Sequence, residues 1–321
     1  MKGKQHIIVS NRDAKFKFDL NRNITIVRGN SGTGKTTLYN MIVDYTRLGE
    51  KSGVNLSSTK KCVALTDINW KNQLESIEDS IVFIDEGAEY IKSKEFAHQI
   101  KNSNNYYVIF NRENLHELPY SVNEIYEIKK SGKYHLFKPV YKSKKHLYYL
   151  NKNKPQKKYN ALLTEDSKSG FQFYENYFKE SDIHCNTSVG NSNIYGWLKE
   201  HSDEKTIVIV DGAAFGSQID KVLKLKSSIH FDLYCPESFE WLILKSGLIK
   251  TRGINELLEQ PEAYIESLDY FSWEKFFEKY LIDITLDSPY AYSKANLAEV
   301  YYHRHNAEKI IAELFEENND F

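Results

Sequence analysis

The feature that most constrains this chain is a Gly-rich segment at residues 29–36, which reads Gly-Asn-Ser-Gly-Thr-Gly-Lys-Thr. It follows a short apolar stretch, Ile24–Arg28, that predicts a β-strand, and it leads into a predicted helix from Lys35 to about Leu48. Glycines let the backbone wrap closely around a phosphate with its N–H groups directed inward, and the helix N-terminus attracts the same anion. The segment therefore predicts a nucleotide cradle in an α/β domain.

The residues of this segment have separate expected roles. Lys35 supplies a positive charge to the β- and γ-phosphates, and Thr36 offers its hydroxyl to Mg²⁺. We therefore expect ATP or a related nucleoside triphosphate to bind with Mg²⁺. The predicted nucleotide-binding residues are Gly29, Asn30, Ser31, Gly32, Thr33, Gly34, Lys35, Thr36 and Thr37.

A pair of acidic residues follows a second apolar segment. Residues 81–84 read Ile-Val-Phe-Ile and lead to Asp85 and Glu86. We expect Asp85 to bind the Mg²⁺ shell and Glu86 to polarise the attacking water. The next predicted strand, Tyr106–Phe110, leads to Arg112. Two interpretations of Arg112 are open: it contacts the γ-phosphate, in its own subunit or a neighbour's, or it lies at the surface in a turn.

The Gly-rich segment and the Asp85-Glu86 pair resemble the Walker A and Walker B motifs of P-loop NTPases. The Asp-Glu form is more similar to that of ATP hydrolysers than to that of P-loop kinases. Arg112 follows the strand after which AAA-like NTPases often carry a polar sensor residue. No signature of the ABC type lies between Lys35 and Asp85, which disfavours an ABC-type ATPase. The resemblance implies an ATPase domain with a mainly parallel sheet.

Alternation of apolar and polar segments predicts two α/β domains. The first covers residues 1–152, with further strands at 7–9, 15–18 and 63–65 and a hairpin within 125–150 around Ser131-Gly132. The polar run 151–158 is the expected boundary. The second domain covers residues 159–321 and is predicted to be mostly helical after Ile254.

Three acidic residues of the second domain follow predicted strands. Glu165 follows residues 161–164, Asp211 follows 206–210 and Glu237 follows 229–233. The carboxyl ends of parallel strands meet at one edge of a sheet, where three carboxylates would bind Mg²⁺ or Mn²⁺ through oxygen. We therefore predict these three acids as catalytic metal ligands. The alternative is that the acids near 165–167 and 237–238 cap the helices that follow.

From Tyr159 to about Leu244 the chain resembles a Toprim domain, which carries a glutamate after its first strand and an Asp-x-Asp motif after a later one. Glu165 and Asp211 match this pattern, but Ala213 stands in place of the second aspartate, which leaves Glu237 or Glu240 to complete the site. Lysines near the end of some Toprim nucleases stabilise the scissile phosphate. Lys294 is a candidate for that role, although we interpret it as a surface lysine.

The combination of a P-loop ATPase with a Toprim-like domain resembles the overcoming-lysogenization-defect nucleases and related anti-phage defence proteins. The resemblance implies a homo-oligomer that processes nucleic acid. Two alternatives differ in class: an ATP-dependent sensor or scaffold whose metal site is inactive because of Ala213, and a small-molecule kinase. Glu86 and the second domain disfavour the kinase.

The distribution of charge also bears on the partner. Residues 129–164 hold eleven lysines and no acid, whereas 255–321 hold fifteen acids and five Lys or Arg. The basic stretch indicates a phosphate-rich partner, with a solvated linker as the alternative. Without an apolar run of about 20 residues or paired cysteines, we expect a cytoplasmic protein that does not enter a membrane.

Overall fold

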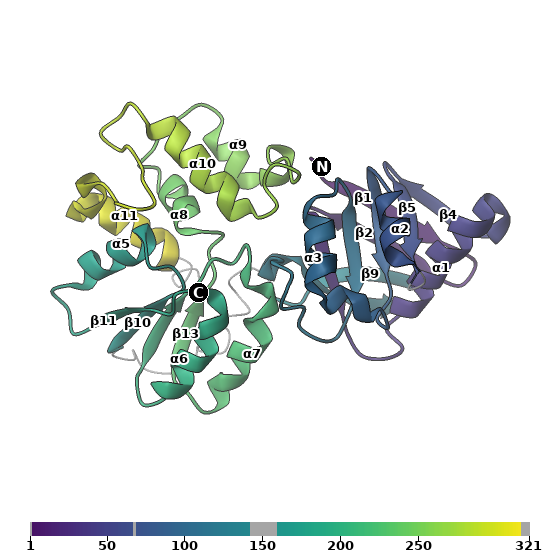
Figure 1. Ribbon diagram of the computed structural model, residues 1–321, viewed down its shortest axis with the longest axis horizontal. Coiled ribbons are helices and arrows are strands. Elements are labelled where there is room, and N and C mark those ends of the chain that lie inside the picture. The colour runs from purple at the N-terminus through teal and green to yellow at the C-terminus, as the bar shows by residue number, and fades with distance from the viewer. Residues whose placement is uncertain (1, 67–68, 142–158, 316–321) are drawn as a thin grey trace. The chain divides into compact units, whose positions relative to one another are not determined.

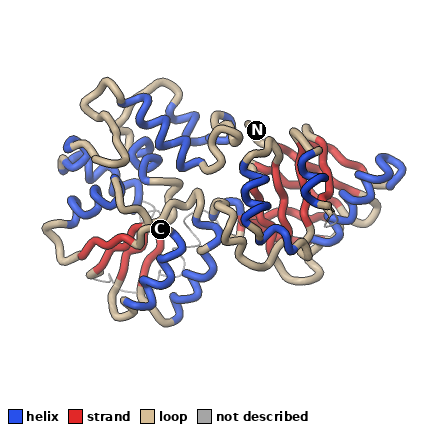
Figure 2. The backbone as a smooth tube through the Cα atoms, viewed as in Figure 1, coloured by secondary structure: helices blue, strands red, loops and turns tan. Residues whose placement is uncertain are grey.

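The computed structural model describes residues 2–66, 69–141 and 159–315, and the chain forms two compact units (Figure 1). Unit 1 consists of Met1–Tyr120, Glu124–Val140 and Gln260–Phe271. Unit 2 consists of Ser121–Asn123, Tyr141–Glu259 and Ser272–Phe321. Each unit has its own sheet with helices packed around it (Figure 2). The predicted boundary at 151–158 lies outside the described residues.

The sheet of unit 1 is large and mostly parallel, as the sequence predicted. Its strand order is β4-β1-β2-β9-β8-β3-β7-β6-β5. Strands β8, β3, β7, β6 and β5 run parallel, whereas β1 pairs antiparallel with β2 and β4, and β8 pairs antiparallel with β9. The strands are β1 Gln5–Ser10, β2 Lys15–Leu20, β3 Ile24–Arg28, β4 Asn55–Ser58, β5 Lys61–Leu65, β6 Ser80–Ile84, β7 Tyr106–Phe110, β8 Ile125–Ser131 and β9 Tyr134–Pro139.

Helices cover both faces of the parallel half of this sheet. The three central strands β3, β6 and β7 are buried along their whole length, which is typical of parallel strands covered on both faces. Helix α1 (Lys35–Leu48) packs on one face through Leu38, Met41 and Ile42, which share one side of the helix. On the other face, Phe96 of α3 (Lys94–Lys101) contacts Tyr107 edge-on, beside α2 (Trp70–Glu75).

The sheet of unit 2 has four parallel strands in the order β11-β10-β12-β13. They are β10 Ala161–Thr164, β11 His184–Thr187, β12 Thr206–Ile209 and β13 Phe231–Tyr234. The chain moves from β10 to β11 on one side and then to β12 on the other side. This reversal creates a crevice at the carboxyl ends of β10 and β12, where ligand sites form in open parallel sheets.

The helices of unit 2 lie between the strands of this sheet in the chain and after its last strand. They are α5 Ser169–Phe178, α6 Ile194–Glu200, α7 Ile219–Lys224, α8 Phe239–Lys245, α9 Ile254–Glu259, α10 Trp273–Thr285 and α11 Arg304–Phe315. The predicted helical character after Ile254 is therefore confirmed over the described residues.

Two strands were missed in the sequence because their composition is not apolar. β4 reads Asn-Leu-Ser-Ser and β11 reads His-Cys-Asn-Thr, and neither has a fully buried residue. Both lie at the edge of a sheet, where only one neighbouring strand contributes hydrogen bonds. Their position, and not their side chains, makes them strands.

Gly212 provides a test of the tight packing beside the crevice of unit 2. A Cβ at this position would lie 2.5 Å from the carbonyl oxygen of Cys235 and 2.9 Å from that of Pro236, and backbone atoms cannot rotate away. We expect Gly212→Ala to lower the free energy of unfolding by about 2 kcal/mol in urea titrations. Gly196, in α6 and with open space around its Cα, is the control, where alanine should add about 0.5 kcal/mol. Equal stabilities of the two variants would contradict the prediction.

Candidate functional site

The Gly-rich loop of unit 1 has the backbone that a phosphate cradle requires. Gly29, Gly32 and Gly34 have φ values of 127°, 81° and 105°, a region that favours glycine. Gly34 is also confined, because a Cβ there would lie 3.0 Å from the ring of His135, which stacks on Phe16. The aromatic pair lies directly against the loop and was not identified from the sequence.

Lys35 begins helix α1 and its side chain lies inside the loop. The residue is only 4% exposed. Its Nζ donates to the carbonyl oxygens of Gly29 and Asn30, the second at 3.1 Å, and it lies 3.6 Å from Oε2 of Glu86. Burial lowers the pKa of Lys35, which the charge of Glu86 partly offsets. The ammonium group is therefore held among acceptors that an anionic ligand would replace.

Strand β7 lies between β3, which carries the loop, and β6, which leads to the two acids. The residue after the end of β7, Asn111, is followed by Arg112, so this side chain emerges between the loop and the acids. Arg112 forms an ion pair with Glu86 and donates to Oγ of Ser31 at 3.0 Å. The side chain of Arg112 is 49% exposed, as the surface interpretation expects, and its guanidinium also joins the loop to Glu86.

The remaining predicted residues surround this cluster. Asp85 is partly buried and its charge acts on Lys35. Thr36 and Thr37 are exposed in the first turn of α1, and Thr33 donates to the carbonyl oxygen of Asn30 at 3.1 Å. The first hydrogen bond of the helix runs from Leu38 N to Gly34 O, so the N–H groups before it have no acceptor in the helix. Backbone donors, two cations and two acids thus converge on the carboxyl edge of the sheet.

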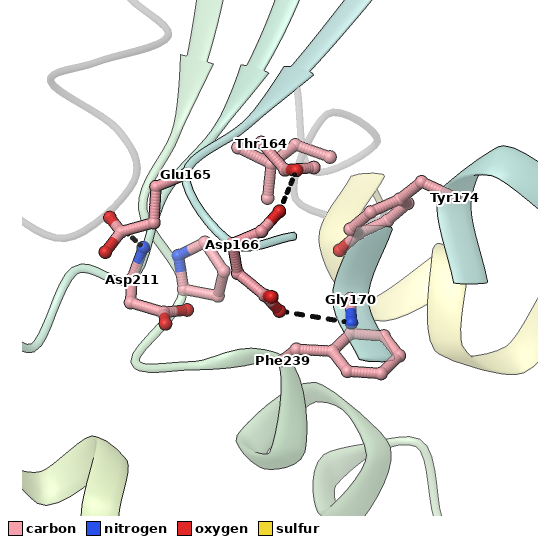
Figure 3. Close-up of a pocket in the computed structure, with 9 residues that line it drawn as sticks. Thr164, Glu165, Asp166, Gly170, Tyr174, Asp211 and Phe239 are labelled. Atoms are coloured by element: carbon pink, nitrogen blue, oxygen red, sulfur yellow. Dashed lines mark hydrogen bonds between the residues drawn. The ribbon is translucent and has the colours of Figure 1, made fainter. Parts of the chain in front are cut away.

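In unit 2, the structure brings Glu165 and Asp211 together at the crevice between β10 and β12 (Figure 3). Each residue follows its strand directly or after one position, and both are partly buried. The backbone N–H of Asp211 donates to Oε2 of Glu165 at 3.2 Å. The reversal of strand order therefore accounts for this pairing of two acids that are 46 positions apart in sequence.

The surroundings of the two carboxyl groups raise the pKa of both. Burial, followed by the charge of Glu274, raises the pKa of Glu165 to about 7. Burial, followed by the charge of Glu165, raises the pKa of Asp211 well above its usual range. The charge of Lys294 offsets these increases only in part, so a further cation would stabilise the pair in its ionised form.

Lys294 carries a charge that acts on both Glu165 and Asp211, and our interpretation of it as a surface lysine was wrong. Its side chain is 15% exposed and its Nζ lies 3.2 Å from Oε1 of both Glu240 and Glu274. Burial alone would lower the pKa of Lys294, but the charges of Glu240, Glu274 and Asp211 raise it. The sequence has no signal for this cluster, because its members come from α8, α10 and a later loop.

Glu237 has a different hydrogen-bond partner and does not join Glu165 and Asp211. Its Oε1 accepts a hydrogen bond from the side-chain amide of Asn123 at 3.0 Å. Over residues 2–66, 69–141 and 159–315, no group of three or more His, Cys, Asp or Glu side chains is placed to hold a metal ion. The acids at strand ends are thus a close pair, Glu165 and Asp211, and not a ready triad.

The helix-capping alternative applies to neighbouring residues. Asp166 accepts from the backbone N–H groups of Lys168 and Gly170 at the start of α5. Ser238 accepts from Trp241 N at 3.2 Å and caps α8. Glu165 does not act as the cap, so its carboxylate remains directed at the crevice.

A small cavity of about 20 Å³ adjoins the acid pair, which is room for about one water molecule or small cation. Glu165, Asp166, Asp211 and Tyr174 are among its lining residues (Figure 3). Tyr174 is 2% exposed, and its hydroxyl has no hydrogen-bond partner among the described residues. An unpaired buried hydroxyl is unfavourable without a water or a ligand atom beside it. Tyr174 is a site residue that sequence reasoning missed.

Comparison with models of known protein families found no match to this chain, and a search of curated proteins found no relative. Among the helices that the structure describes, none combines the length and the apolar composition needed to cross a membrane.

The raised pKa of Glu165 predicts a pH dependence of stability. A glutamate in the unfolded chain has a pKa of about 4.3, so between there and about 7 the folded state binds more protons than the unfolded state. Stability therefore falls as pH rises through this range. In wild type, this titration lowers the free energy of unfolding by about 2 kcal/mol between pH 5 and pH 7. We expect Glu165→Gln to lack this part of the decrease.

Urea titrations at pH 5, 6, 7 and 8 measure this difference. Glu175→Gln, which removes an exposed glutamate from α5, is the control and should follow the wild-type curve. If Glu165→Gln also follows the wild-type curve, the pKa of Glu165 is not raised in the folded protein. The proposed shortage of positive charge around Glu165 and Asp211 is then wrong.

Proposed function

We propose that this chain binds and hydrolyses a nucleoside triphosphate, with ATP as the expected ligand, and that unit 2 processes nucleic acid with a divalent metal ion. The observation that carries the first part is the convergence of Lys35, Arg112 and Glu86 on the Gly-rich loop. The Walker-type resemblance of the same residues supports it.

The loop residues fit a bound triphosphate. Positive φ values at three glycines leave the loop backbone open to phosphate oxygens, and Lys35 already lies among backbone acceptors. Thr36 and Asp85 are the residues that would hold Mg²⁺, which would supply positive charge to the phosphates.

Glu86 has two cationic partners, Lys35 and Arg112. A γ-phosphate competes for both cations, because a charge-assisted hydrogen bond to phosphate is strong. Release of Glu86 then lets its carboxylate polarise a water molecule for attack on phosphorus. In this proposal nucleotide binding itself frees the group that promotes hydrolysis.

Two variants separate binding from hydrolysis. Lys35→Ala removes the buried cation and should abolish ATP binding in calorimetry. Glu86→Gln keeps the shape of the side chain but removes the base, so ATP should bind within a few-fold of wild type while hydrolysis falls about 100-fold.

Lys51→Ala and Glu89→Gln are matched controls, because both residues are exposed and outside the cluster. Both should bind and hydrolyse ATP as wild type does. Unchanged affinity in Lys35→Ala would reject the assignment of the loop, and unchanged hydrolysis in Glu86→Gln would reject the role of that carboxylate.

The proposal for unit 2 rests on the acid pair at the crevice. Glu165 and Asp211 would hold one Mg²⁺ or Mn²⁺ ion, which fits their shortage of positive charge and the small cavity beside them. Such an ion activates water and stabilises a phosphoryl transition state. Lys294 is held next to the pair and would attract a phosphate group. The resemblance to defence nucleases implies DNA or RNA as substrate, a homo-oligomer and an anti-phage role.

A second candidate function is an ATP-dependent sensor or scaffold with an inactive second site. Two observations favour it: Ala213 replaces an expected acid, and Glu237 is bonded to Asn123. In this case unit 2 would bind a partner without cutting it.

Asp211→Asn distinguishes the two candidates. With Mg²⁺ or Mn²⁺, and with and without ATP, wild type should cut labelled DNA or RNA, and Asp211→Asn should lose at least about 100-fold in rate. The exposed Asp203→Asn is the control and should retain wild-type cleavage. Intact ATP hydrolysis without cleavage of any substrate would favour the sensor.

A further inference from the structure

The part of the unit 1 sheet formed by β2, β9 and β8 has one covered face and one exposed face. Side chains alternate between the faces along each strand. On the covered face, Phe16, Phe18 and Ile128 belong to the same core as helix α1. The opposite face carries half-buried and exposed residues along β2 and β9 and along β8 from Glu127 onward.

Strand register places the residues of the exposed face in rows. Lys17 is paired with Leu136, and Leu136 is paired with Lys129 on its other side. In the next row, Lys15 is paired with Tyr134. Paired residues on neighbouring strands lie about 5 Å apart, so lysines flank the two apolar side chains.

The two apolar side chains on this face are unusually accessible. Tyr134 is 54% exposed and Leu136 is 46% exposed. Both occupy a strand that reverses direction from β8 through Ser131-Gly132, as the sequence predicted. A tyrosine ring beside lysines offers a flat apolar surface together with positive charge.

Positive charge dominates the face, although two acids share it. Lys15, Lys17, Lys129 and Lys138 are opposed by Asp19 and Glu127. Asp19 pairs with His6, and Glu127 pairs with Lys129, whose charge is therefore shared between this acid and a ligand on the face. The rows of Tyr134 and Leu136 contain no acid.

We propose that this face, defined by Lys15, Lys17, Lys129, Tyr134 and Leu136, binds single-stranded nucleic acid. Lysines contact the phosphates, and the Tyr134 ring stacks on a base that a single strand exposes. A duplex hides its base faces, and an acidic protein segment would use the lysines but not need a stacking ring. Binding here does not depend on the proposed ATPase or metal site, since none of these residues belongs to either.

Fluorescence anisotropy with a labelled 20-nucleotide single strand tests the proposal on the full chain. EDTA is present and nucleotide is left out, so that neither ATP hydrolysis nor metal-dependent cleavage takes place. The result therefore does not depend on whether the proposed function is correct. We expect Lys17→Gln with Lys129→Gln to weaken binding about tenfold and to reduce the slope of log affinity against log salt by about 1.4. Tyr134→Ala should weaken binding about 5- to 100-fold without changing that slope.

Lys94→Gln with Lys101→Gln removes the same charge from helix α3 and should bind as wild type does. Circular dichroism and urea titration confirm that each variant is folded. The proposal is overturned if wild type does not bind the single strand, or if the control weakens binding as much as the lysine pair on the sheet. It is also overturned if Tyr134→Ala binds normally and poly-glutamate displaces the strand, which would assign the face to an acidic protein.

Discussion

Parallel pairing of buried strands is the constraint on which both candidate sites depend. In each unit it brings side chains that follow different strands to one edge of a sheet. In unit 1, β7 separates the strand of the Gly-rich loop from the strand of the acids, and Arg112 fills the space between them. In unit 2, the reversal of strand order brings Glu165 beside Asp211. In the other half of the unit 1 sheet, β2 and β9 have instead one exposed face, which carries lysines together with Tyr134 and Leu136.

The two sites have opposite electrostatic character. The site at the Gly-rich loop has a buried ammonium, Lys35, whose charge is shared with backbone carbonyls and Glu86. The acid site is rich in carboxylates, and Lys294 lies between Glu240 and Glu274. A buried charge is costly unless it is paired. The first site is therefore prepared for an anion and the second for a cation, which is the basis of the proposed functions.

Much of the fold followed from local sequence. Continuous apolar runs predicted the buried strands β6 and β7, and helix α1 has the predicted bounds. Side-chain partners did not follow, because they depend on the packing of distant segments. Lys294 has the composition of a surface residue, and only the arrangement of α8 and α10 buries it among acids. Residues 260–271 were assigned to the second domain, yet they cluster with unit 1.

The sequence by itself determined the loop at 29–36, because its glycines stand where the backbone takes positive φ values. Lys35 comes directly after the last of these glycines. It also determined which acids end strands, because an apolar run that stops at a carboxylate marks the strand end locally. Only the tertiary structure decided which of these groups meet. Strand order joined Glu165 to Asp211, a hydrogen bond to Asn123 engaged Glu237, and β7 placed Arg112 on Glu86. Those contacts arise from pairing and packing across long sequence separations, for which a local pattern has no signal.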